Sequence, residues 1–283
     1  MARHIRITGG VLNVRLHPHP DGIYGEFIEA LYALRRSVKI RGERYAMISL
    51  LNRGEGGEGI YRGLITTFTK IDTEEPWFNA GNMREADDSE VSQIVIPDNL
   101  YPNAAAFNFL FDTNNHKIYI QTYSKGKLLS IKLADKLFSE LSTDLSITRQ
   151  FNRASITISQ SKAGLARVFD LPVIKRVTIT LLKPNADVFE DDFDEKIEGF
   201  LQEIHSRKMT VTVEAEPGRS VVPNAGLRRV SESALEHGAV TVDGRDADGT
   251  TRRSTEDFPR IIHSRYDPDV TSEDNAFRQM TGR

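Results

Sequence analysis

Clusters of arginine and lysine are the side chains in this sequence whose spacing most directly suggests chemistry. Five cations fall within ten residues, opposed only by Glu43, and two arginine pairs follow later in the chain. Side chains of this type, gathered on one surface, bind phosphate oxygens without reading the base sequence. We therefore predict a double-stranded DNA site formed by Arg35, Arg36, Lys39, Arg41 and Arg44, with a second patch at Arg228, Arg229, Arg252 and Arg253.

An acidic run supports a competing hypothesis. The residues are Asp187, Glu190, Asp191, Asp194 and Lys196. Several carboxylates and a lysine are the residue types that a metal-dependent nuclease site requires. If they converge in a concave site, the chain is a nuclease effector. If they point outward from a helix, the acidic face over residues 190–204 suits contact with a protein partner instead.

Three further motifs indicate local structure and not chemistry. Segment 54–59 fits the pattern G-x-G-x-x-G but precedes a strand, whereas a phosphate-binding loop must lead into a helix N-terminus. Residues 159–162 fit the pattern S-x-x-K, which we interpret as a strand end followed by a helix N-cap. His17 and His19 have no carboxylate cluster nearby except Asp21. We therefore predict no catalytic residue, no metal ligand and no cofactor.

The composition limits the classes of protein that the chain can belong to. Its 283 residues include 37 Lys and Arg and 40 Asp and Glu, a net charge of -3. This balance excludes coating of nucleic acid by bulk positive charge but leaves room for a local basic face. The lack of cysteine excludes disulfides and thiolate zinc sites. No segment has the apolar length of a membrane span and the N-terminus lacks a signal-peptide core, so we expect a cytoplasmic protein.

The elements that must position these residues are rich in strands over residues 1–150. Alternation of apolar and polar residues predicts strands, and apolar residues spaced by three and four predict helices. The predicted strands cover residues 5–16, 38–40, 45–51, 60–69, 91–96 and a hairpin over 107–123, and the predicted helices cover 24–34 and 130–141. Residues 71–90 are expected to form a loop in which Trp77 and Phe78 pack back on the core.

The second half alternates strands with helices. The predicted strands are 154–159, 174–182, 209–216 and 240–243, and the predicted helices are 163–169, 193–204 and 224–237. The fold class is therefore α+β, with a strand-rich mixed or antiparallel domain over residues 1–150 and a strand-helix-strand domain over 151–266. Residues 267–283 are polar and are expected to be a disordered tail.

Several stretches resemble a family of uncharacterised bacterial and prophage proteins, which is defined as a domain of unknown function. They are Tyr24–Phe27, Gly63–Lys70, Trp77–Asn79, Phe107–Asp112 with His116, and Val177–Asn185. The resemblance extends over roughly residues 5–250. That family is in turn distantly similar to RexA, the phage-exclusion protein of lambda prophage, through the order of its elements and short matches such as Phe68–Lys70 and Lys183–Pro184.

The resemblance implies a non-enzymatic antiphage defence protein that binds double-stranded DNA, or a phage protein–DNA complex, as a sensor. It also implies a homodimer that passes its signal to a membrane or effector protein partner. The family offers no catalytic motif to carry over, and the net negative charge of this chain departs from what a DNA-binding protein would show. A protein-only adaptor is a further alternative, which an exposed apolar patch without a basic face would favour.

Overall fold

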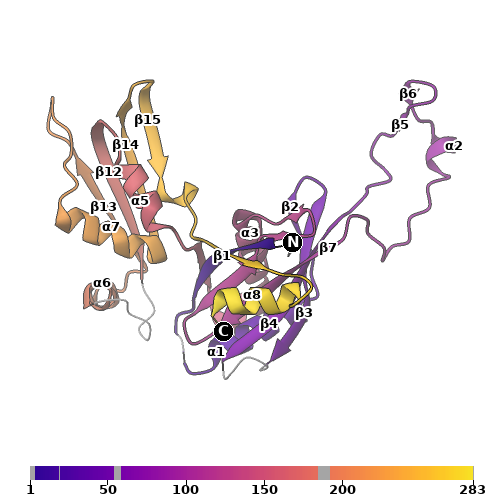
Figure 1. Cartoon of the computed structure of the whole chain (residues 1–283), viewed down its shortest axis with the longest axis horizontal. Helices are drawn as coiled ribbons and strands as arrows, with labels where there is room; N and C mark the ends of the chain where they lie inside the picture. Colours follow the sequence, from indigo (N-terminus) through magenta and orange to yellow (C-terminus); the bar gives the residue numbers. More distant parts are fainter. Residues whose placement is uncertain (1–3, 19, 54–58, 184–191, 283) are drawn as a thin grey trace.

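The computed structural model describes residues 4–18, 20–53, 59–183 and 192–282. Within these ranges the chain forms two units, each built on its own sheet (Figure 1). We call residues 4–158 together with 261–282 the first unit, and residues 159–260 the second unit. The antiparallel sheets and separate helices confirm the predicted α+β class.

The first unit is built on a sheet that contains eight strands of the described chain. Its order is β11-β1-β8-β7-β4-β3-β2, and β16 also pairs with β1. Every pairing in it is antiparallel. The strands are β1 (Ile5–Arg15), β2 (Val38–Arg41), β3 (Arg44–Arg53), β4 (Ile60–Thr69), β7 (Ala105–Asp112), β8 (Lys117–Gln121), β11 (Ser155–Ile158) and β16 (Ile261–Tyr266). A short ladder of β9 (Tyr123–Ser124) and β10 (Lys127–Leu128) follows β8.

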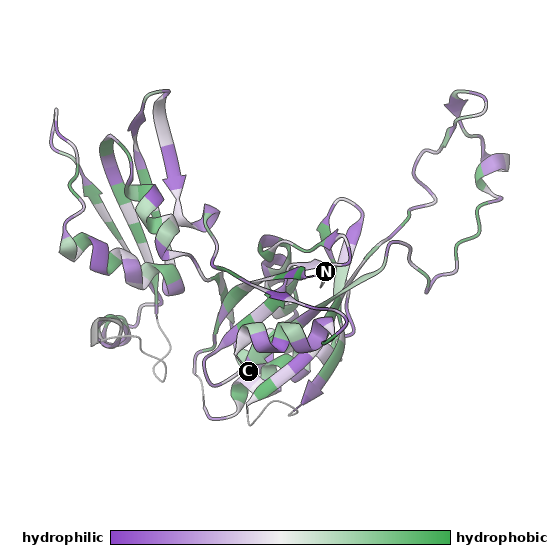
Figure 2. Ribbon diagram, in the orientation of Figure 1, coloured by the Kyte–Doolittle hydropathy of each residue, from purple (hydrophilic) through white to green (hydrophobic). Residues whose placement is uncertain are grey.

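Helices cover both faces of this sheet. The main core lies under α1 (Ile23–Ala33), α3 (Ile131–Ser142) and α4 (Leu145–Phe151), where Phe109 and Phe111 of β7 are buried. Leu110 points to the opposite face because side chains alternate along a strand. There it packs with Ile7 and with Phe277 of α8 (Glu273–Thr281). The alternation of apolar and polar residues along the strands is visible in Figure 2.

The helix α8 corrects the expectation that residues 267–283 form a disordered tail. Ser272 caps the helix, since its Oγ accepts a hydrogen bond from the backbone N–H of Asn275 at 3.2 Å. Its few apolar residues, Ala276, Phe277 and Met280, share one helix face and pack against the sheet. A low apolar content suggested disorder, but those residues are spaced to cover a surface that distant strands provide.

The second unit contains a four-stranded antiparallel sheet, in the order β13-β12-β14-β15 within the described residues. Its strands are β12 (Val173–Leu182), β13 (Lys208–Glu214), β14 (Gly238–Asp246) and β15 (Gly249–Ser254). The helices α5 (Lys162–Phe169) and α7 (Ala225–His237) bury one face around a second core. Helix α6 (Asp192–Glu203) connects β12 to β13, and the 3-10 turn η1 (Thr255–Asp257) follows β15.

The second unit is inserted between two strands that lie along the same side of β1. Strand β11 pairs with Leu12–Arg15, and β16 pairs with Ile5–Gly10. The chain therefore leaves the first unit and returns to it at neighbouring positions. We expected a linear division at residues 150 and 266, whereas the sheet places residues 261–266 in the first unit. Pairing between Gly10 and Ile261 has no local sequence pattern that could reveal it.

A long arm, residues 70–104, projects from the first unit between β4 and β7 (Figure 1). It contains β5 (Phe78–Asn79), β6 (Arg84–Glu85) and α2 (Asp88–Val91). The strand predicted over 91–96 is wrong, because Val91 ends α2 and irregular chain follows. The expected packing of Trp77 and Phe78 on the core is also wrong: Phe78 is 64% exposed and lies far out on the arm.

Candidate nucleic-acid interface

The first predicted basic cluster lies around the end of α1 and the edge strand β2. Arg36 donates to the Asp144 carboxylate at 2.9 Å and to the Glu140 carbonyl at 2.6 Å, which ties α1 to α3 and α4. Lys39 pairs with Glu43 at 2.7 Å, and this hydrogen bond raises the pKa of the Lys39 ammonium. Both cations are therefore used locally, although they remain at the surface.

The other three members of this cluster differ in their surroundings. Arg35 lies over the Tyr32 ring at 4.1 Å, and Arg41 is exposed on β2. Arg44 donates to the Thr67 hydroxyl at 3.0 Å, and partial burial lowers the pKa of its guanidinium. The cluster thus offers Arg35 and Arg41 most openly to a ligand.

The second predicted patch lies on the second unit. Arg228 packs over the Phe169 ring at 5.5 Å, and Arg229 is exposed on the same helix. Arg252 lies 3.7 Å from Asp243, and Arg253 donates to the carbonyls of Arg167 and Asp170 at 3.1 and 3.0 Å. The structure therefore places the nine predicted residues in two groups on different units.

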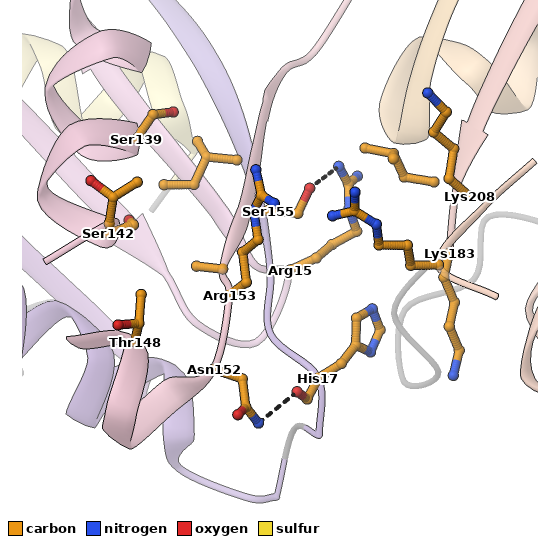
Figure 3. A pocket seen from close by; sticks show the side chains of 15 residues that line it. Arg15, His17, Ser139, Ser142, Thr148, Asn152, Arg153, Ser155, Lys183 and Lys208 are labelled. Atoms are coloured by element: carbon orange, nitrogen blue, oxygen red, sulfur yellow. Dashed lines mark hydrogen bonds between the residues drawn. The ribbon is translucent and has the colours of Figure 1, made fainter. Parts of the chain in front are cut away.

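A basic cleft between the two units is a stronger candidate than either group. Its volume is about 680 Å³. The first unit contributes Arg15, His17 and Arg153, and the second contributes Lys183, Arg207 and Lys208. Figure 3 shows the labelled cations on both sides of this space. None of the described residues that line the cleft is Asp or Glu.

Arg15 forms the floor of the cleft and joins the two units. Its side chain is buried, and its Nη1 donates to the Glu236 carbonyl at 3.2 Å, near the end of α7. Its Nη2 donates to the hydroxyls of Ser155 at 3.3 Å and Thr157 at 3.1 Å. A cation at a helix C-terminus is favoured by the helix dipole and the unpaired carbonyls.

Burial lowers the pKa of the Arg15 guanidinium to about 10, so the group is still charged near neutral pH. Its Nε is buried and has no hydrogen-bond partner within the described part of the chain. The nearest compensating carboxylate, Glu236, also lies 3.6 Å from Lys117 and 3.7 Å from Arg260. One carboxylate thus faces three cations, which leaves positive charge beneath the cleft.

Arg153 and Arg207 are the cations that the cleft presents most directly. Both are exposed, and among the described residues neither guanidinium forms an ion pair or a hydrogen bond. They come from opposite units, so one phosphate chain could contact both. Lys183, in contrast, directs its ammonium to Gln202 at 3.0 Å and Glu198 at 3.8 Å.

Sequence patterns did not identify these residues, because Arg15 and Arg153 stand apart from the predicted clusters and Arg207 has only Lys208 beside it. Arg15 lies inside a predicted strand, Arg153 follows a helix and Arg207 precedes a strand. Only the insertion of the second unit brings their segments together. The sequence offers only one further indication, an arginine without Asp or Glu directly beside it. That feature is too common in proteins to identify a site.

The competing acidic run cannot be assembled into a site from the described residues. Asp187, Glu190 and Asp191 lie outside the ranges that the structure describes, and Lys196 is exposed on α6. Among the described residues, no three His, Asp or Glu side chains are grouped so that they could hold a metal ion. The S-x-x-K segment is confirmed as a helix cap, because Ser161 Oγ accepts from the Gly164 N–H at 2.9 Å.

Comparison with models of protein families identifies the family of the chain. A family model described as a domain of unknown function (DUF4747) matches residues 5–282, nearly the whole chain. No curated protein matches the sequence. Within the described ranges, none of the helices is long and apolar enough to cross a lipid bilayer.

Proposed function

The chain belongs to the DUF4747 family, and we propose that it is a non-enzymatic protein that binds the phosphate backbone of double-stranded DNA in the basic cleft between its two units. The observation that carries this proposal is the convergence of Arg15, Arg153 and Arg207 in a cleft whose described lining has no carboxylate. Exposed guanidinium groups bind phosphate through charge-assisted hydrogen bonds, often in a bidentate manner.

The net charge of -3 is unusual for a DNA-binding protein, but the negative charge is not spread evenly along the chain. The arm, residues 70–104, has eight Asp and Glu against two Lys and Arg, and residues 184–203 have eight Asp and Glu against one Lys.

The rest of the chain therefore carries 34 Lys and Arg against 24 Asp and Glu, a net charge of +10. The negative charge is therefore concentrated in two segments, the arm, whose only cations are Lys70 and Arg84, and residues 184–203. A basic body of this kind attracts nucleic acid even when the whole chain is acidic.

The volume of the cleft limits how much of a DNA duplex could enter it. A volume of about 680 Å³ lies in the range of small-ligand sites, so the cleft would hold a segment of one backbone and not a whole duplex. Lys208, at the start of β13, and the exposed cations of each unit would extend the contact outside the cleft. Binding of this kind depends on phosphate charge and has little sequence preference.

The resemblance to RexA gives this binding a biological role within the proposal. DNA in the cleft would touch both units at once, and it would therefore favour one relative placement of the units over others. That shift is the signal which, in an antiphage sensor, would pass to an effector or membrane partner. The bond-making chemistry would then reside in the partner.

Fluorescence anisotropy with a labelled 30-base-pair duplex at several salt concentrations tests the proposal. We expect Arg153→Ala with Arg207→Ala to weaken binding at least tenfold and to reduce the slope of log K against log salt by about 2, one phosphate contact per residue. Arg219→Ala is the matched control, because Arg219 is exposed and pairs with Glu216 outside the cleft. Equal affinities for the double variant and the control would refute the cleft as the DNA site.

A further inference from the structure

The arm of residues 70–104 carries an inference that is independent of the DNA site. We propose that it is a dimerisation arm, which packs antiparallel against the arm of a second copy of this chain. In this arrangement the acidic tip of each arm lies against the basic neck of the other. The tip is defined as residues 78–95, and the neck as Lys39, Arg41, Arg44 and Lys70.

Stacked aromatic rings join the base of the arm, around the neck, to the first unit. Phe68 at the end of β4 stacks on Tyr101 with ring centroids 4.7 Å apart, and Tyr45 continues the stack at 6.4 Å. The Lys70 ammonium lies 4.5 Å from the centre of the Tyr45 ring. The Thr69 N–H donates to the Pro102 carbonyl at 3.0 Å, so the two strands of the neck are joined. Figure 1 shows that the arm points away from both sheets.

The tip has its own folded structure although it has no core. Asp87 and Glu90 form a capping box at the start of α2, and the Ala86 N–H donates to the Trp77 carbonyl at 2.7 Å. Asn79 Nδ2 donates to Glu90 at 2.5 Å, which joins β5 to α2. A tip ordered by local hydrogen bonds keeps a fixed surface, and a fixed surface costs less entropy to bind.

That surface is unusually apolar for a solvent-exposed segment. Phe78, Met83, Val95 and Leu100 are 64%, 76%, 85% and 60% exposed. None of them belongs to the three hydrophobic cores of the described chain. Large apolar side chains gathered on a projecting segment indicate a surface that is buried against a partner.

The charge of the arm identifies the partner. Glu85, Asp87, Asp88 and Glu90 lie in the tip, and the arm as a whole has a net charge of -6. Arg84 pairs with Asp87 and Glu90 at 3.3 Å each, and the tip that remains is net negative, so it repels nucleic acid and is complementary to a basic protein surface. This chain has one at the root of the same arm, where the Lys70 N–H donates to the Glu43 carbonyl in the turn between β2 and β3. That turn carries Arg41 and Arg44.

Two copies of the chain can bury the exposed apolar residues and pair each acidic tip with a basic neck in one symmetric contact. Arms that lie side by side in opposite directions place each tip at the other neck, so acidic side chains meet basic ones twice. The exposed apolar residues of each tip, Phe78, Met83 and Val95, would then lie beside the neck of the other copy, and Leu100 would lie between the two ends. The same patch is used on both copies, so the contact closes at a dimer and does not propagate.

Light scattering coupled to gel filtration, without nucleic acid, tests this inference on the full chain. We expect the wild type to be a dimer at micromolar concentration, and Phe78→Ser with Met83→Ser to raise the dissociation constant at least tenfold. Val222→Ser and Val270→Ser are matched controls, since these valines are 78% and 82% exposed outside the arm. A monomeric wild type, or a dimer unaffected by the arm variant, would overturn the proposal.

Charge reversal tests the orientation of the arms. Glu85→Lys with Asp88→Lys, and separately Lys39→Glu with Arg41→Glu, should each weaken the dimer at least tenfold. Mixing the two variants should restore one of the two tip-to-neck contacts in a heterodimer, and combining all four changes in one chain should restore both. Loss of folding cannot produce such a rescue. Failure of the combined variant to dimerise, with an unchanged circular dichroism spectrum, would overturn the antiparallel arrangement.

Discussion

Asp135 should make the stability of the protein fall as the pH rises from about 4 to about 6. This residue lies on α3, where burial raises the pKa of its carboxyl from 3.8 to about 6 and Glu256 adds to the effect. The hydroxyl of Ser139, 3.5 Å away, acts in the opposite direction. A group whose pKa is higher in the folded state contributes stability below its unfolded pKa, and this contribution is lost as the pH rises through its folded pKa.

The size of the effect follows from the shift. About two pKa units correspond to about 3 kcal/mol. Because part of the carboxyl still contacts water, solvent screening reduces this to about 1–2 kcal/mol. Asp135→Asn removes the charge, keeps the shape and keeps an oxygen that accepts from Ser139. We therefore expect the variant to exceed the wild type in stability by about 1–2 kcal/mol at pH 7.5 and to differ least from it at pH 4.

Urea unfolding of both proteins between pH 4 and pH 8 measures this difference directly. The difference in free energy of unfolding should be smallest at pH 4, should increase mainly between pH 4 and pH 6, between the unfolded and folded pKa values, and should be constant above about pH 7. General acid effects are common to both proteins and cancel in the difference. A constant difference across this range, or a variant less stable than wild type at pH 7.5, would refute the reasoning.

Two further substitutions test the packing that positions the cleft. Gly63→Ala should prevent stable folding of the first sheet, because a Cβ at Gly63 would overlap the Leu50 carbonyl and the Phe109 ring; circular dichroism and the soluble yield would show this, and a Tm within 2 °C of wild type would contradict it. Arg15→Met should cost about 3 kcal/mol, since it removes three hydrogen bonds that Arg15 donates, to the Glu236 carbonyl and to the Ser155 and Thr157 hydroxyls. Urea unfolding measures that loss, limited proteolysis should show faster cleavage between the units, and wild-type values in both would count against a joining role.

Local patterns predicted most of the elements near the candidate site. The hairpin of Phe107, Phe109 and Phe111 was predicted because the alternation of side chains and the turn both lie within about 15 residues, and β7 and β8 confirm it. The helix predicted over 130–141 is α3, with Ser130 as its cap. The same local reasoning failed for the arm, where apolar residues without a helical or strand period were assigned to the core.

The sequence predicted a basic surface at two clusters, whereas the candidate cleft is lined by other cations. A basic surface for phosphate was the expectation, yet several of the predicted cations, including Arg36, Lys39 and Arg253, are engaged in contacts within the protein. Clustering along the chain identifies charge density, but it does not reveal which cations face a shared space. Arg153 and Arg207 could not be selected from the sequence, because a lone arginine or a short pair such as Arg207 with Lys208 does not show which segments meet in space.

The sequence by itself determined most of the elements, the α+β class and the separation of acidic segments from a basic remainder, because these depend on residues close together in the chain. Only the tertiary structure decided that β16 returns to β1, that α8 covers the first sheet and that Arg15, Arg153 and Arg207 line one cleft. These arrangements depend on pairing between residues more than 100 positions apart. Such pairing is selected by the packing of the whole fold, for which no local period exists.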